Sequence, residues 1–162
     1  NSEEAKGLDQ INKQVLDKFG IQNGATHSEY IRGTDGRYYF LETSSRVGGA
    51  HIPDMVEAAT GVNIWREWAR LENALLEGTN YSVEETQKLY SGLIVALAKD
   101  KHPNTQNLQS DEVEKFLPID YHIGIVYKAK TADIIEERLD QAAEVVTEQI
   151  LNILPPKEKP TS

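Results

Sequence analysis

The sequence predicts an α+β fold in which antiparallel β-hairpins or sheets are packed by helices. In several segments apolar residues recur every three or four positions, as expected for amphipathic helices. Other segments are short, rich in aromatic or β-branched residues and bounded by turn residues, which is typical of strands. Helices and strands do not alternate in a clean βαβ series, so a parallel sheet is not expected.

The first quarter of the chain predicts a helix followed by a β-hairpin. Apolar residues at helical spacing predict the helix over residues 3–19, and Gly20 follows where a left-handed backbone ends a helix. Strands are expected over residues 25–32 and 37–43, the second of which is rich in Tyr and Phe. The sequence GTDG, residues 33–36, predicts the turn between them.

Two helices and a strand are expected next. A short helix over residues 52–59 should end at Gly61. An apolar stripe predicts a helix over residues 62–76, with Asn63 as its N-cap. The apolar segment 89–98 is expected to be a strand.

The last third of the chain predicts a strand and a long helix. Residues 100–109 are polar and turn-like, and residues 111–116 are expected to form one helical turn. The apolar segment 121–129 predicts a strand, which we expect to pair with the strand before it. Residues 132–154 predict an amphipathic helix that packs on this second sheet. Residues 155–162 are rich in proline and charge and predict a flexible tail.

These elements suggest two subdomains and a tail. The first, residues 1–78, carries the hairpin, and the second, residues 79–154, is a smaller α+β unit. The tail is residues 155–162.

Composition excludes several classes of function. The chain has 162 residues, a net charge of −9 and a pI near 4.9. Nucleic acids and anionic membranes attract basic surfaces, so neither is an expected partner. Cysteine is absent, which excludes disulfides and thiolate metal sites and is consistent with a cytoplasmic protein. No apolar run approaches the ~20 residues that span a bilayer.

Two glutamates, Glu29 and Glu42, lie in the two strands of the expected hairpin. If residues 33–36 all form the loop, Glu29 opposes Phe40. If only the last two form it, Glu29 opposes Glu42. Both registers place the two glutamates on one face, because side chains alternate with period two. A three-residue loop would place them on opposite faces.

On one face, the two glutamates would lie roughly 5 to 8 Å apart at Cβ. Like charges at this distance need compensation, and Mg²⁺ uses one or two carboxylates together with water and substrate phosphates. The pair therefore suits a magnesium–nucleotide site. The alternative is that each glutamate is solvated or pairs with Arg32 or Arg37.

An arginine and a glycine pair follow the second strand. Arg46 lies four residues after Glu42, and its guanidinium matches the geometry of phosphate or carboxylate oxygens. Gly48 and Gly49 allow a sharp bend or a close approach to a ligand. Their alternative role is a simple turn between strand and helix. The two serines before the arginine have no neighbouring general base, so a serine hydrolase is not expected.

The stretch HSEYIRGTDGRYYFLETSSRVGGAHIPDMVEAATGVNI, residues 27–64, resembles the ATP-grasp superfamily. The shared pattern is a strand with Glu, a short hairpin, a strand ending in Glu, an arginine, a glycine-containing loop and a helix ending in TGV. The resemblance implies the C-terminal half of an ATP-grasp fold. It implies a ligase that joins a carboxylate to an amine or thiol through an acylphosphate, with ATP and Mg²⁺ (or Mn²⁺) as cofactors.

The resemblance also implies roles for single residues. Glu29 and Glu42 would hold the metal against the ATP phosphates, and Ser44 stands where the family usually has a third metal ligand, Asn. Arg46 would be the catalytic residue that contacts phosphate or stabilises charge on the transferred phosphoryl group. The nucleotide-binding residues implied in this way are Glu29, Glu42, Arg46, Gly48 and Gly49.

Two alternatives stay open. A biotin carboxylase-like subunit is similar through the hairpin and TGV, but that branch carries a Glu-His pair after the arginine, whereas Ala50 precedes His51 here. A carboxylate–amine ligase is therefore preferred. The other alternative is a degenerate ATP-grasp interaction module without catalysis, which the serine at position 44 would suit. That module predicts glutamates that are splayed apart or paired with Lys or Arg.

The resemblance has consequences for partners. The lysines and glycine-rich flap that cover the phosphates in the family lie well upstream of the first glutamate strand, and only 26 residues precede His27 here. We expect the N-terminal half of the same enzyme as a partner and the fragment alone to be inactive. The expected substrates are small-molecule carboxylates and amines, whose identity the sequence leaves open, as it does a homodimer. We also expect Trp65 and Trp68 in the core, and Asp54 and Glu57 facing solvent.

Overall fold

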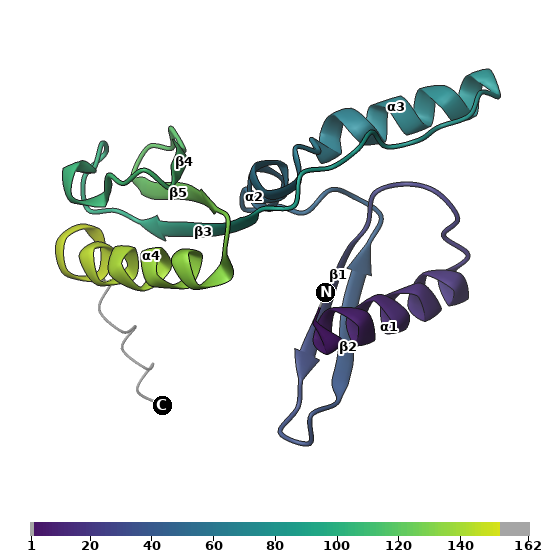
Figure 1. Cartoon of the computed structure of the whole chain (residues 1–162), viewed down its shortest axis with the longest axis horizontal. Coiled ribbons are helices and arrows are strands. Elements are labelled where there is room, and N and C mark those ends of the chain that lie inside the picture. The colour runs from purple at the N-terminus through teal and green to yellow at the C-terminus, as the bar shows by residue number, and fades with distance from the viewer. Residues whose placement is uncertain (1, 153–162) are drawn as a thin grey trace, which may run out of the picture. The chain divides into compact units, whose positions relative to one another are not determined.

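The computed structural model describes residues 2–152 and confirms the α+β class (Figure 1). The chain divides into two compact units. The first contains Asn1–Gly49 and Asn63–Glu85, and the second contains Ala50–Val62 and Thr86–Ser162. The boundary expected after residue 78 therefore falls inside the first unit. The sequence also did not indicate that the short helix after the glycine pair belongs to the second unit.

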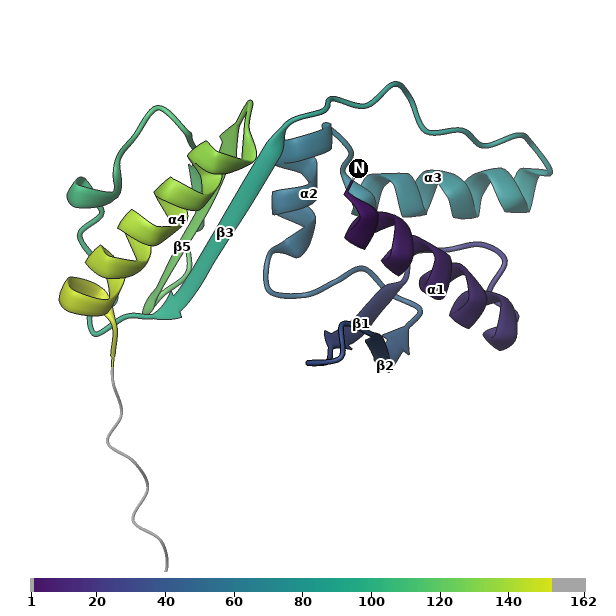
Figure 2. The ribbon, with the colours of Figure 1, turned by 60° about the horizontal axis from the view of Figure 1, so that its bottom comes forward.

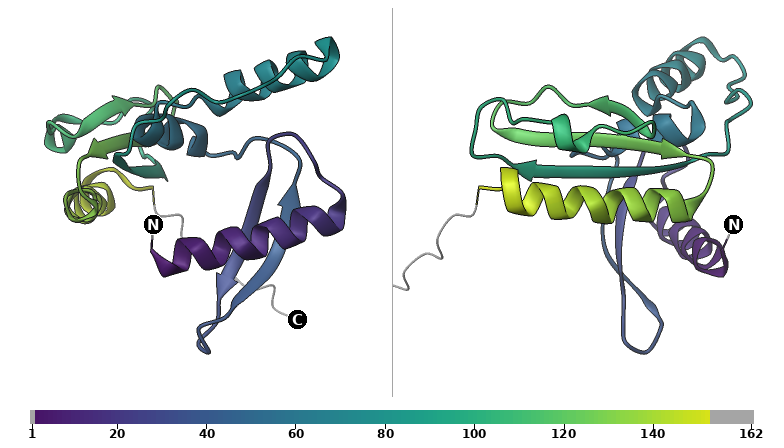
Figure 3. Two further views of the ribbon diagram at one scale, coloured as in Figure 1. Left: turned by 45° about the vertical axis from the view of Figure 1, so that its right-hand side comes forward. Right: turned by 60° about the vertical axis from the view of Figure 1, so that its left-hand side comes forward.

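In the first unit, a helix lies against one face of a two-stranded antiparallel hairpin (Figures 1 and 3). Tyr30 donates a hydrogen bond to Asn12 of the helix at 3.0 Å, and the rings of Phe19 and Phe40 lie 6.4 Å apart. The helix ends at Gly20, whose φ is +69°. The elements are α1 (Glu3–Phe19), β1 (His27–Arg32) and β2 (Tyr38–Ser44).

Helix α3 (Ile64–Glu77) also belongs to the first unit. Asn63 caps it, as expected, by accepting a hydrogen bond from the Arg66 amide at 3.0 Å. The core role expected for the tryptophans is wrong for Trp65, which is 56% exposed and stacks on Trp68. The following segment runs back along the helix (Figure 1), and its Tyr81 donates a hydrogen bond to Glu67, one of the residues of α3 that are buried.

The second unit is a three-stranded antiparallel sheet between two helices (Figures 2 and 3). The strand order is β3-β5-β4, so the central strand pairs on both sides. Helix α4 packs on one face and α2 on the other. The elements are α2 (Ile52–Thr60), β3 (Tyr90–Leu97), η1 (Gln106–Leu108), β4 (Val113–Phe116), β5 (His122–Ala129), α4 (Ala132–Val145) and the π-helical turn η2 (Val146–Ile150).

Alternation along β5 builds a core on each face of this sheet. Val126 points to the α2 side, where it packs with Ala58 and Leu117. Its neighbours in the strand point to the α4 side. The buried residues there are Ala98, Leu108, Ile123, Ile125, Tyr127, Ile135, Ala142, Val146 and Ile150.

Two expectations for the second unit are corrected. The expected helical turn at residues 111–116 is wrong, because residues 113–116 form the edge strand β4. Its structure comes from pairing with β5, which a local pattern does not reveal. The long helix ends at Ile150, before the predicted 154. Residues 153–154 and the predicted tail lie outside the described residues. No helix in residues 2–152 has the length and apolar character needed to cross a membrane.

Candidate functional site

The hairpin turn contains three residues. In a regular ladder, a loop of this length would place the two glutamates on opposite faces of the hairpin. The amide of Gly33 donates to the carbonyl of Arg37 at 2.8 Å, so these two residues close the loop. The Gly36 amide donates to the Gly33 carbonyl at 3.0 Å, and Gly36 has a φ of +78°. This arrangement is a turn followed by a left-handed residue, a common three-residue hairpin connection. With this loop and a regular ladder, Glu29 would face Leu41.

A β-bulge restores the pairing. Tyr30 pairs with Phe40, but the next pair along the ladder is Glu29 with Glu42, so Leu41 is left without a partner. A bulge inserts one residue into one strand and moves every later residue to the other parity. Glu29 and Glu42 are therefore direct cross-strand neighbours, for which Cβ separations of about 4.5–5.5 Å are usual.

The two faces of the hairpin have different chemistry. One face is covered by α1, and on it Ser28 and Thr43 are joined by a hydrogen bond of 2.9 Å. The other face carries the glutamates. By register and alternation, the residues on this carboxylate face are His27, Glu29, Ile31, Tyr39, Glu42 and Ser44.

In the part of the chain that the structure describes, neither glutamate is paired with arginine or lysine. Glu29 is about half exposed, and its carboxylate lies 3.3 Å from the His27 imidazole. The Glu42 side chain forms no hydrogen bond or ion pair within residues 2–152. The arginines proposed as alternative partners are used elsewhere: Arg32 pairs with Glu4, and Arg37 lies 3.8 Å from Asp35.

Arg46 follows the hairpin in an exposed position. Its amide donates to the Ser44 carbonyl at 3.0 Å, and its guanidinium donates to the carbonyl of Val47, also at 3.0 Å. The Val47 side chain is buried and anchors this turn. Most of the arginine donors remain available to a ligand, because a guanidinium has five.

The glycine pair does not use its special backbone freedom. Among the described residues with positive φ are Ala50, at +49°, and His51, at +62°, whereas Gly48 and Gly49 are not among them. The unusual conformation expected at the glycines therefore occurs just after them. Left-handed backbone at two consecutive residues with side chains costs energy and is found where the surroundings enforce it.

His51 belongs to a charged cluster in the second unit. Its Nδ1 lies 2.8 Å from the carboxylate of Asp54, whose other oxygen accepts a hydrogen bond from Lys115. Burial raises the pKa of Asp54, but the hydrogen bonds from Lys115 and His51 outweigh it and hold the pKa below its usual value. The expectation that Asp54 faces solvent is thus wrong, and Glu57 is half-buried.

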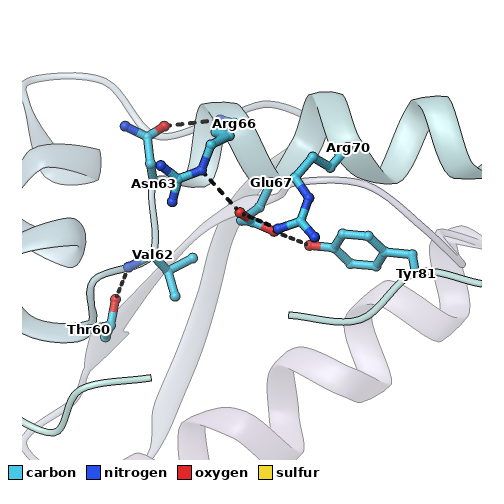
Figure 4. A network of polar contacts seen from close by, with 7 residues as sticks. All are labelled: Thr60, Val62, Asn63, Arg66, Glu67, Arg70 and Tyr81. Carbon is cyan, nitrogen blue, oxygen red and sulfur yellow. Dashed lines mark hydrogen bonds and ion pairs between the residues drawn. The ribbon is translucent and has the colours of Figure 1, made fainter. Parts of the chain in front are cut away.

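Sequence reasoning also missed a polar network on α3. Glu67 is buried and contacts Arg66, Arg70 and Tyr81 (Figure 4). A signal was present, because two arginines four residues apart share a helix face, with a glutamate between them. This signal was overlooked because the apolar stripe of α3 was interpreted as the buried side of the helix.

The chemistry of the carboxylate face fits Mg²⁺. The described residues contain no group of three His, Asp or Glu side chains that could hold a metal by themselves. Mg²⁺ does not require such a cage, since it usually takes one or two carboxylates and completes its shell with water and phosphate oxygens. Two adjacent carboxylates that have no Lys or Arg partner within residues 2–152, with the Ser44 hydroxyl on the same face, provide that donor set.

Comparison with known proteins supports the fold. No family model matches the sequence, and no curated protein matches it. Among solved structures, the chain is similar to phosphoribosylglycinamide synthetase from Anaerococcus prevotii, with a TM-score of 0.57 and 18% identity over 93% of this chain. It is also similar to L-amino acid ligase from Bacillus licheniformis, with a TM-score of 0.60 and 18% identity over 96% of this chain.

Both of these proteins are ATP-grasp enzymes, and the chain matches their C-terminal portion. It spans 42% of the length of each. The chain therefore has the fold of the C-terminal part of an ATP-grasp enzyme, as the sequence pattern predicted.

Proposed function

We propose that this chain is the metal- and phosphate-binding part of an ATP-dependent ligase that joins a carboxylate to an amine or thiol. The observation that carries the proposal is the direct pairing of Glu29 with Glu42 on the hairpin face opposite α1. The degenerate interaction module would have splayed glutamates or glutamates paired with Lys or Arg. Within residues 2–152 neither arrangement is present, so the geometry favours the ligase.

In this proposal Glu29 and Glu42 hold Mg²⁺, and Ser44 contributes a hydroxyl directly or through water. The metal, when bound, neutralises charge on the phosphate oxygens of ATP. Arg46 contacts the phosphate that is transferred, because its guanidinium is exposed and only partly used by Val47. Gly48 and Gly49 allow the nucleotide phosphates to approach the backbone. The substrate carboxylate is activated as an acylphosphate, and the amine or thiol then displaces phosphate.

The second half of the active site is supplied by an N-terminal half of the same enzyme in this proposal. The carboxylate face leaves two large side chains open: Ile31 is 53% exposed and Tyr39 is 50% exposed. A nucleotide and a covering domain would bury them. The printed name of one structural neighbour, L-amino acid ligase, supports a small carboxylate and an amine as substrates. A cytoplasmic location and a homodimer stay predictions.

A biotin carboxylase-like subunit is the second candidate, and one residue argues against it. Ala50 occupies the position where that branch has a glutamate. Ala50 has an exposed, left-handed backbone and offers no carboxylate to the site. The ligase therefore remains the preferred function.

The direct test is a Mn²⁺ titration of the chain with and without ADP. The electron paramagnetic resonance signal of free Mn²⁺ measures how much of the ion is bound. We expect saturable binding that ADP strengthens and that the double variant Glu29→Gln, Glu42→Gln loses. The double variant Glu84→Gln, Glu85→Gln is the matched control, because both of these glutamates are exposed and the change in charge is the same. Equal binding by the double variant and the parent chain would rule out the carboxylate pair as the metal site.

A further inference from the structure

A groove lies between α3 and the segment that follows it, apart from the carboxylate face. Its volume is about 520 Å³, within the range of small-molecule sites. It lies wholly within residues 66–82, so both of its walls belong to the first unit. Its polar lining residues include Arg66, Arg70, Asn73, Thr79, Asn80 and Tyr81.

A buried carboxylate fixes the two arginines at the edge of this groove (Figure 4). Glu67 is only 8% exposed. One of its oxygens lies 3.3 Å from Arg66 Nε and 3.1 Å from Arg70 Nη1. The other accepts from Arg70 Nη1 at 3.0 Å and from the Tyr81 hydroxyl at 3.2 Å. Both carboxylate oxygens therefore have two donors each.

The arginines retain most of their hydrogen-bonding capacity. In contacts with residues 2–152, the Arg66 side chain uses only Nε and the Arg70 side chain uses only Nη1. Their side chains are 60% and 45% exposed. A guanidinium presents its N–H groups as a planar fork that matches a carboxylate with two parallel hydrogen bonds. The remaining donors of both arginines are thus open to a ligand in the groove.

The charge in the groove is unbalanced by one unit. The two arginines carry two positive charges, and Glu67 supplies one negative charge beneath them. None of the other lining residues is acidic. A ligand with one negative charge would balance the site, whereas a phosphate dianion would leave an excess of negative charge next to a buried carboxylate. The balance therefore favours a carboxylate group.

We propose that the groove between α3 and residues 79–82 binds a small polar molecule through a carboxylate, held by Arg66 and Arg70. The rest of the ligand meets neutral hydrogen-bonding groups, because Asn73, Thr79 and Asn80 line the groove and their side chains have no partner within residues 2–152. This site is independent of the carboxylate pair on the hairpin, and it can exist whether or not the chain is part of a ligase.

The test is a nuclear magnetic resonance titration of the full chain with sodium L-lactate, a small hydroxy acid. The signals to follow are the side-chain N–H groups of Arg66 and Arg70 and the ring of Tyr81. Lactamide has nearly the same shape without the charge and serves as the matched ligand control. We expect saturable shifts with lactate and none at these signals with lactamide. No saturable shift by about 100 mM lactate, far above a millimolar Kd, would overturn the proposal.

Variants separate binding from support of the fold. Arg66→Gln should weaken lactate binding about tenfold or more, the usual consequence of losing hydrogen bonds to a charged group. Arg138→Gln is the control, because Arg138 is paired with Glu112 in the second unit. Arg70→Gln risks leaving Glu67 buried without its main partner, so the second variant is Glu67→Gln. It removes the competing carboxylate and should tighten lactate binding.

Two further results would overturn the proposal. If Arg66→Gln binds lactate as well as the parent chain does, the arginines serve only to neutralise Glu67. If inorganic phosphate shifts the same signals at lower concentration than lactate does, the groove prefers phosphate to a carboxylate of single negative charge.

Discussion

Glu29 and Glu42 face each other across the hairpin, and Glu42 has no counter-charge within the described residues. The hairpin therefore carries an electrostatic cost in the absence of a cation, since like charges directly opposite are unfavourable. A cation that binds between them would relieve this cost.

Neutralising Glu42 should stabilise the metal-free chain. We expect Glu42→Gln to raise the free energy of unfolding by about 0.2–1 kcal/mol, the usual scale of a cross-strand pair. Glu29→Gln should raise the free energy of unfolding by a smaller amount, because it also weakens the contact with His27. Urea denaturation without divalent metal measures the effect, with Glu84→Gln as the neutral control. A loss of stability in Glu42→Gln would mean that the carboxylates do not repel each other.

Deleting Leu41 should preserve the carboxylate pair. Leu41 is the unpaired residue of the bulge, so its removal joins Phe40 directly to Glu42 and leaves every observed pair in place. We expect nuclear Overhauser contacts between residues 29 and 42 to remain, and Mn²⁺ binding with them. Leu41→Ala, which keeps the bulge, is the control. If the deletion removes these contacts, the bulge is not what sets the register.

Replacing Ser44 should change metal affinity in a defined direction. Ser44 pairs with His27 on the carboxylate face, two residues after Glu42. Ser44→Asn provides an amide oxygen and should lower the Kd for Mn²⁺, whereas Ser44→Ala should raise it or leave it unchanged. A titration of the two variants beside Thr43→Val, which alters the opposite face, measures the difference. Weaker binding by Ser44→Asn would place this residue outside the metal shell.

The Asp54 cluster should make the second unit sensitive to acid. Because the pKa of Asp54 is lower in the folded chain, its stabilising effect is present above the unfolded value, about 3.9, and is lost as the pH falls through the folded value. Asp54→Asn should cost about 1–3 kcal/mol at pH 7, since it weakens hydrogen bonds from Lys115 and His51.

This cost should shrink as the pH falls below about 4, where Asp54 of the unfolded chain takes up a proton, and should vanish below the folded pKa, where the parent carboxyl is also neutral. Urea denaturation between pH 7 and pH 3 tests it, with exposed Asp111→Asn as control. A difference between Asp54→Asn and the parent that does not depend on pH would show that the charge on Asp54 is not what stabilises the cluster.

Local chemistry made much of the fold predictable. Helix α1 has the predicted bounds, and Asn63 and Gly61 mark helix ends as expected. These features depend on contacts within one helical turn, which are made by residues that are close together in the sequence. The candidate site also came from a local pattern, because a resemblance over residues 27–64 placed the glutamates and the arginine in one motif; their role in binding stays a prediction. The exposure of Trp65 and the strand β4 depend on segments distant in sequence, so local patterns gave the wrong answer for them.

The sequence by itself determined that two glutamates, a serine and an arginine stand around one hairpin of an α+β protein. Only the tertiary structure decided that the glutamates face each other. A three-residue loop places Glu29 opposite Leu41 in a regular ladder, and the bulge at Leu41 reverses that outcome. The physical reason is that strand parity depends on every residue between the two positions, so a single residue that leaves the ladder exchanges the faces.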